Sequence, residues 1–139
     1  MDSLFGNIAV GLFSGIVAGL VTGFYSGLVV SRFVRFTSLC SEAHRAMNSI
    51  EYMQEHGRVM VSRNDSSAVP LVAADLIYFG HKSAGIRVDE EHKNVADAML
   101  KAEQGKLEVK DLEEVLNQAR HGIRRTRPAL RILLPWGRV

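Results

Sequence analysis

The chain has 139 residues and a formal net charge of +2, from 17 Lys and Arg against 15 Asp and Glu. Its hydrophobic content of 47% is raised by one apolar stretch near the N-terminus. The single cysteine, Cys40, excludes an intrachain disulfide and therefore a disulfide-stapled domain, and it fits a reducing compartment.

The first predicted element is an uncharged stretch of 27 residues from Leu4 to Val30. A helix of that length, at about 1.5 Å per residue, crosses a hydrocarbon core of about 30 Å with some tilt. A segment in lipid must satisfy its own backbone hydrogen bonds, so we expect a transmembrane helix here despite the glycines.

This stretch repeats every four residues as small, Gly, large, large. Helix positions four apart form one ridge, so the glycines make a groove with a second small ridge beside it. The pattern resembles the glycine-zipper form of the small-xxx-small motif, which implies close packing against a second helix and favours a homo-oligomer. The alternative is that glycine is simply common in membrane helices. The expected interface is Gly11, Ser14, Gly15, Ala18, Gly19, Thr22, Gly23, Ser26 and Gly27.

The flanks of the stretch predict its orientation. No basic residue precedes it and the run is too long for a signal peptide, so we expect it to be retained. Asp2 lies before it, whereas Arg32 and Arg35 follow it. By the positive-inside rule, the N-terminus lies outside and the C-terminus is cytoplasmic, in a single pass of the inner or plasma membrane.

The same helix is expected to continue into the cytoplasm as far as about His56. Its apolar residues step by three and four along one face. This seam either extends the oligomer contact or, as we favour, packs on later helices of the same chain. Its members are Phe33, Phe36, Cys40, Ala43, Met47 and Ile50, with Leu39, Ala46 and Met53 beside them.

Three further helices are expected after a polar turn region. The first covers about 70–83 with Pro70 in its first turn, and its many apolar residues make it the central element. The second covers about 89–104 with Asp89 as N-cap and Gly105 as stop, and the third covers about 108–125. A strand over Arg58–Ser62 would lack a partner and is not predicted. The inward stripes are Val95, Ala98, Met99 and Ala102, then Val109, Leu112, Val115, Leu116, Ala119 and Ile123.

The predicted fold is therefore all-α. A single N-terminal transmembrane glycine-zipper helix continues into a small cytoplasmic antiparallel helical bundle. The expected divisions are the transmembrane helix with its short N-terminal tail at 1–31, the cytoplasmic helical domain at 32–126 and a basic, apolar tail at 127–139.

Charge is unevenly distributed along the cytoplasmic part. Nine acids face four lysines between Asp89 and Glu114, and after Glu114 six arginines occur without an acid. The apolar, arginine-rich tail suits an anionic membrane surface. The alternative, which we favour, is that the tail folds onto the bundle and its arginines pair with the acidic helix. Nucleic-acid binding is not expected, because no recognition helix or aromatic platform occurs. The membrane-surface candidates are Arg124, Arg125, Arg127, Arg131 and Trp136.

No pattern of catalytic or metal-binding residues occurs. The five histidines form neither HExxH nor a paired ExxH arrangement, and no phosphate loop or GxSxG elbow occurs. We expect these histidines to be solvated or capping, and we expect no enzymatic activity, no metal and no cofactor. They are His44, His56, His81, His92 and His121.

These observations favour a membrane-anchored, self-associating scaffold, adaptor or regulatory subunit. The expected partners are the lipid bilayer, a second copy of the chain, and anionic lipid headgroups or another membrane protein. The rival is a pore-forming or membrane-permeabilising protein, holin-like or a toxin effector. Its narrow lumen would be lined by the small polar groups of the span, namely Asn7, Ser14, Thr22, Tyr25 and Ser26.

Overall fold

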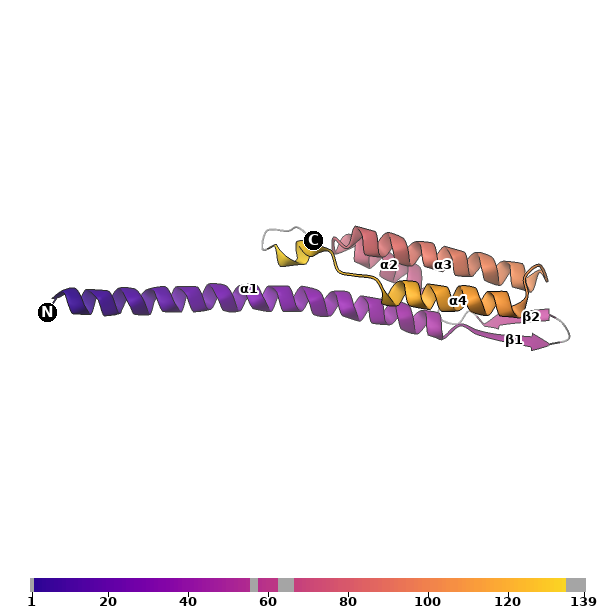
Figure 1. Cartoon of the computed structure of the whole chain (residues 1–139), viewed down its shortest axis with the longest axis horizontal. Coiled ribbons are helices and arrows are strands. Elements are labelled where there is room, and N and C mark those ends of the chain that lie inside the picture. The colour runs from indigo at the N-terminus through magenta and orange to yellow at the C-terminus, as the bar shows by residue number, and fades with distance from the viewer. Residues whose placement is uncertain (1, 56–57, 63–66, 135–139) are drawn as a thin grey trace.

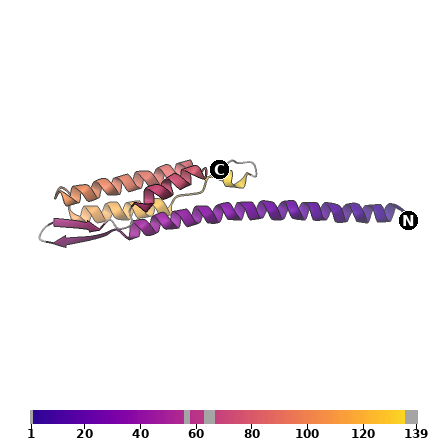
Figure 2. The same ribbon diagram turned by 180° about the vertical axis from the view of Figure 1, so that it is seen from behind.

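A computed structural model describes residues 2–55, 58–62 and 67–134 and shows a mostly helical molecule (Figure 1). Helix α1 (Asp2–Asn48) is much longer than the other elements, and its N-terminal half projects from the molecule without a neighbour (Figures 1 and 2). A bundle packs against one side of its C-terminal half (Figure 1). The bundle elements are β1 (Glu51–Glu55), β2 (Arg58–Ser62), α2 (Ala68–Tyr78), α3 (Lys82–Glu103), α4 (Val109–Arg124) and the short 3₁₀ helix η1 (Leu130–Leu133).

The lower half of α1 forms one wall of the hydrophobic core. Its buried residues repeat at helical spacing and contact α2 and α4, so the predicted seam packs on the chain's own helices, as favoured. Two seam positions were wrong: Phe33 lies above the bundle with 53% of its surface exposed, and Met53 lies outside the helix. The buried members are Phe36, Leu39, Ala43, Ala46, Met47 and, just beyond the helix end, Ile50, and Cys40 is half-buried.

Helix α1 ends at Asn48, and the prediction of a helix to about His56 was wrong. The last carbonyls of α1 are satisfied by other groups: the Ser49 hydroxyl donates to Ala46 O at 2.8 Å, and Arg120 donates to Met47 O at 3.5 Å. These bonds stabilise a helix end, and the chain then turns into a strand.

An antiparallel hairpin follows, which the sequence analysis did not predict. In its register, Tyr52 pairs with Val61 and Gln54 with Val59. Val59 is buried and β2 contacts α3, whereas Met60 and its partner Met53 are exposed on the outer face. This alternation is that of a half-buried strand pair. The fold is mostly helical, as predicted, and this hairpin is a small two-stranded sheet that the prediction did not include.

The turn between α2 and α3 lies earlier than expected. Gly80 has φ 79° and donates to Ile77 O at 3.0 Å, while His81 N donates to Leu76 O at 2.8 Å. This pair of bonds is a Schellman helix end, which favours glycine at the left-handed position. Helix α3 therefore begins at Lys82. Asp89, predicted as its N-cap, instead lies inside α3 and pairs with Lys93 at 2.6 Å.

The extent of α4, the C-terminal end of α3 and the inward stripes of both helices agree with expectation, whereas the start of α3 does not. Helix α4 has Glu108 and Arg125 as its flanking residues, and Gly105, with φ 71°, ends α3 in a second Schellman arrangement. All four predicted stripe residues of α3 are buried. On α4, Val109 and Val115 are partly buried and the other four predicted stripe residues are buried. Pro70 lies in the first turn of α2, as expected.

Helix α2 is less central than predicted. It buries one face through Val72, Ala73 and Leu76, but Leu71 and Tyr78 remain 69% and 77% exposed. The chain therefore uses α2 as an outer helix packed on α1 and α3.

Two glycines mark the closest approaches between helices. A Cβ at Gly85 on α3 would lie 2.5 Å from both the Ala73 carbonyl oxygen and Ile77 Cγ1 of α2. A Cβ at Gly122 on α4 would meet the carboxylate end of Glu91 on α3. At Gly85 the added Cβ would therefore clash with backbone, which cannot move alone, whereas at Gly122 it would clash with the end of a flexible side chain.

We therefore expect Gly85→Ala to destabilise the bundle by about 1–3 kcal/mol, because α2 and α3 must move apart. Gly122→Ala should change stability by less than about 0.5 kcal/mol, because the gain of about 1 kcal/mol in helix propensity offsets the cost of moving the flexible Glu91 side chain aside. Thermal unfolding of the full chain in detergent measures both. Equal losses for the two variants would contradict the close α2–α3 packing.

Candidate functional site

The exposed half of α1 is the first candidate site. Among the described residues, one helix is long and apolar enough to cross a membrane, and the most apolar 18-residue window of Val10–Asn48 has a mean hydropathy of 1.7 with none of it buried. Large side chains lie exposed on all sides of this segment, including Phe13, Leu20 and Phe24 at 71%, 70% and 75%. Such a helix presents an apolar surface in every direction.

The nine predicted interface residues all lie on this part of α1, and all are exposed. A Cβ at any of the five glycines would meet nothing within 4 Å, so their groove is open. The hydroxyl groups are already used within the helix. Ser14 donates to Gly11 O, Thr22 to Ala18 O and Ser26 to Gly23 O, at 3.0, 2.7 and 3.1 Å.

The glycine groove winds around α1 because each step of four residues advances about 40°. Gly27 is 16 residues before the fully buried Ala43, a net rotation of about 160°, and Gly23 lies about as far round on the other side. At its C-terminal end the groove therefore faces away from the bundle. The protein's own helices do not cover it there.

The C-terminal tail returns along α1. The Tyr25 hydroxyl donates to Leu133 O, and Arg32 Nη1 donates to Leu134 O at 3.0 Å. Arg124, Arg125 and Arg127 are exposed. The side chain of Arg131 and all of Trp136 lie outside what the structure describes, so these two membrane-surface candidates have no observed position.

Charge separates along the length of the bundle. The segments 26–41 and 76–88 and all residues after Glu114 contain no Asp or Glu. These segments supply the middle of α1, the α2–α3 turn and the tail, which lie together at the end of the bundle nearest the exposed helix (Figure 1). The opposite end holds the α3–α4 turn, with Glu103, Glu108 and Asp111. The end next to the exposed helix is thus the basic one.

A cavity of about 180 Å³ lies between α1 and the α2–α3 turn at this basic end. Sequence analysis did not predict it, because its walls come from residues more than forty positions apart. The Arg35 guanidinium stacks on the Phe79 ring at 3.7 Å from the ring centre. The lining residues are Ser31, Arg32, Arg35, Phe36, Leu39, Phe79 and His81.

His81 is buried, so the expectation of a solvated or capping side chain was wrong for this histidine. Only 3% of its surface is exposed, its ring lies edge-on to Phe36, and its Nδ1 accepts from Ala129 N at 3.3 Å. The accepting Nδ1 places the proton on Nε2. Burial lowers the pKa of His81 from its ordinary value of 6.5, which favours the neutral ring.

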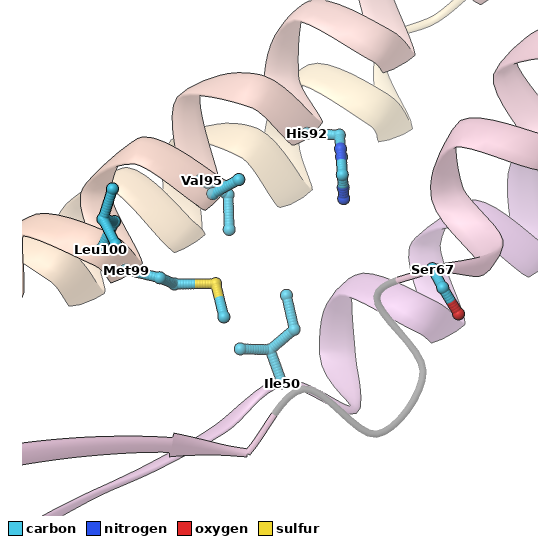
Figure 3. Close-up of a pocket in the computed structure, with 7 residues that line it drawn as sticks. Ile50, Ser67, His92, Val95, Met99 and Leu100 are labelled. Atoms are coloured by element: carbon cyan, nitrogen blue, oxygen red, sulfur yellow. The ribbon is translucent and has the colours of Figure 1, made fainter. Parts of the chain in front are cut away.

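The other reactive side chains were compared with the requirements of a metal site. No group of three or more metal-ligating side chains occurs in the part of the chain that the structure describes. Burial raises the pKa of Cys40 to about 11, which fits a packing role. A pocket of about 330 Å³ at the far end is lined mainly by Ile50, Val95, Met99 and Leu100, and there the Ser67 hydroxyl points away from the His92 ring (Figure 3).

Comparisons with protein-family models, with curated proteins and with solved structures found no match for this chain.

The buried His81 predicts a pH dependence of stability. Because its pKa is lower in the folded state, the unfolded state takes up the proton first, so stability is complete above about pH 6.5 and falls as the pH drops below it. His81→Gln keeps an acceptor for Ala129 N and cannot titrate. The melting temperature of this variant should fall less between pH 8 and pH 5.5 than that of the natural chain.

The pKa of His44 is also lowered, first by burial and then by the charges of Arg124 and Arg120, so a smaller pH dependence should remain in His81→Gln. An unchanged pH dependence in that variant would mean that His81 is not the buried neutral group described here.

Proposed function

We propose that the protein is a single-pass membrane-anchored scaffold or regulatory subunit that self-associates through α1 and presents its helical bundle to the cytoplasm. It acts by binding rather than by catalysis. The observation that supports this most strongly is the contrast within one continuous helix. The C-terminal half of α1 has a buried face, whereas its N-terminal half has apolar side chains exposed in every direction.

The energy of that exposure favours a bilayer. Eight large apolar side chains between Val10 and Phe24 are exposed. At about 1.5–3 kcal/mol for each buried side chain, their cost in water is on the order of 10 kcal/mol, which is comparable to the stability of a whole small domain. Lipid removes this cost and leaves no backbone group unpaired, because the segment is helical.

The charge distribution supports the orientation. The basic end of the bundle adjoins the apolar helix, with Arg32 and Arg35 directly after the span and no acid nearby along α1. Cationic loops remain on the cytoplasmic side of membranes. This distribution supports a bundle in the cytoplasm and an N-terminus outside.

The direction of the glycine groove supports self-association. Near the bundle, Gly23 and Gly27 face away from the buried side of α1, so a second copy can approach there without meeting the first copy's bundle. Ridges of residues four apart favour right-handed crossings, in which close backbone contact replaces the hydrophobic driving force that lipid removes.

The pore-forming alternative has less support. The hydroxyl protons of Ser14, Thr22 and Ser26 already go to carbonyls of their own helix, and the Tyr25 hydroxyl donates to the tail. A water-filled lumen would have few free donors along its wall. Release of dye from liposomes that contain the purified protein would nevertheless favour the pore over the scaffold.

Self-association is tested by filling the groove. Gly19→Ile should lower the dimer fraction in detergent or bilayers at least several-fold, because a branched side chain blocks backbone contact. The matched control is Leu20→Ile, which keeps volume and lies among the large residues, so its dimer fraction should not change. Equal dimer fractions for the two variants would refute the glycine interface.

A further inference from the structure

The cavity lined by Arg32 and Arg35, called the arginine cavity below, lies at the level of the membrane surface if α1 spans the bilayer as proposed. The uncharged stretch ends at Val30, and at about 1.5 Å per residue Arg32 lies about 3 Å and Arg35 about 7–8 Å beyond it. The headgroup layer on each side of a bilayer is about 5–8 Å thick. Both guanidinium groups therefore lie at the level of lipid phosphates.

The two positive charges in the lining of the cavity favour an anionic ligand. The segments that form its walls, 26–41 and 76–88, contain no carboxylate to neutralise Arg32 and Arg35. Arg35 is held against Phe79, and Arg32 is fixed by its bond to Leu134 O, so both cations are positioned before a ligand arrives. Guanidinium groups bind phosphate oxygens through paired, charge-assisted hydrogen bonds.

The cavity also continues toward the apolar part of α1. A shallow groove lined by Gly23, Phe24, Gly27 and Leu28 shares Ser31 and Arg32 with it. The two hollows follow one side of the helix, with cations at the lower end and hydrocarbon side chains and bare glycine backbone at the upper end. This is the polarity of a phospholipid molecule in the cytoplasmic leaflet.

The size of the cavity limits the ligand. At about 180 Å³ it is smaller than the roughly 300–1,000 Å³ of ordinary small-molecule pockets, so it holds one headgroup phosphate rather than a whole metabolite. Phe36, Leu39 and Phe79 make the rest of its lining apolar. The buried His81 ring forms part of the cavity wall and carries no negative charge.

We propose that this cavity binds the phosphodiester of one anionic phospholipid through Arg32 and Arg35, with an acyl chain lying against Phe24 and Leu28 on the flank of α1 between the cavity and the glycine interface. This site rests on the proposed transmembrane position of α1. It differs from diffuse attraction of the basic tail to a membrane. Arg124 lies close enough to His44 for its charge to lower the pKa of that residue. His44 is about 21 Å beyond Val30 along α1, so Arg124 lies well outside the headgroup layer.

The test uses the full chain, purified in a non-ionic detergent and titrated with dioctanoyl phosphatidylglycerol while native mass spectrometry counts bound lipid. One lipid should bind each chain, and dioctanoyl phosphatidylcholine should bind at least tenfold more weakly. Inorganic phosphate and glycerol 3-phosphate distinguish a lipid site from a free-phosphate site, and neither should compete at equal concentration, because neither fills the groove.

The variants are Arg35→Gln and Arg32→Gln, each of which should raise the phosphatidylglycerol Kd at least tenfold. Arg124→Gln removes the same charge from an exposed position and should leave the Kd unchanged. Arg35→Lys keeps the charge but loses the planar guanidinium, so its Kd should lie between those of the natural chain and Arg35→Gln. Unchanged melting temperatures without added lipid show that the variants fold.

Equal losses for Arg124→Gln and Arg35→Gln would overturn the site in favour of diffuse surface charge. Competition by inorganic phosphate would overturn the lipid assignment. Extraction of the natural chain from cell membranes by alkaline carbonate would refute the membrane span itself, independently of any lipid titration. A chain that resists extraction but shows no preference for phosphatidylglycerol keeps the proposed span and loses the cavity site.

Discussion

The structure depends on one constraint: a helix with apolar side chains on every side needs a surrounding that is apolar on every side. The large apolar side chains from Val10 to Phe24 are exposed, and the glycines leave the backbone open along a winding groove. Only at the lower end of this segment does the Tyr25 hydroxyl bond to the tail among the described contacts. In the proposed transmembrane position a bilayer would supply that surrounding, and helix geometry would satisfy the backbone hydrogen bonds inside it. The bundle then has to form from what remains below, using only the lower half of α1.

Continuity of α1 links the two halves mechanically. The buried face at Ala43 and the groove at Gly27 lie on opposite sides of the same continuous helix, so the bundle lies on the outer side of a pair that makes contact at Gly23 and Gly27. Two bundles would then be displayed apart from each other, with their acidic ends farthest from the membrane. Such an arrangement leaves both bundles accessible to partners, which suits a scaffold better than a sealed channel.

Sequence patterns predicted the features that depend on local periodicity. The inward stripe from Val95 to Ala102, the stop at Gly105 and the extent of α4 follow from helix spacing and end signals. The hairpin was missed because the apolar spacing of Met47, Ile50 and Met53 resembles a helix, and the strands are stabilised by each other and by α3. The position of the α2–α3 turn was predicted wrongly because Asp89 is a residue type that favours the N-cap, and because Gly80 follows a run of apolar residues that favours continuation of the helix.

The arginine cavity was beyond sequence analysis for a different reason. Arg35 and Phe79 are more than forty residues apart, and their contact exists only because α1 packs on α2. Arg32 and Arg35 entered the sequence argument as topology signals, and the buried state of His81 had no local signature. Non-local packing places these two residues, which the sequence offered only as predicted orientation signals, in the wall of a cavity.

The central claim is that residues 10–30 lie within the bilayer with the bundle in the cytoplasm. Single cysteines introduced at Ser3, Leu20 and Ser38 in a Cys40→Ser background test it with a membrane-impermeant thiol reagent, because a thiol in hydrocarbon cannot ionise to react. The account predicts labelling at position 3 in intact cells, at position 38 only after permeabilisation, and at position 20 in neither case. Labelling at position 20 in permeabilised cells, or at position 38 in intact cells, would contradict it.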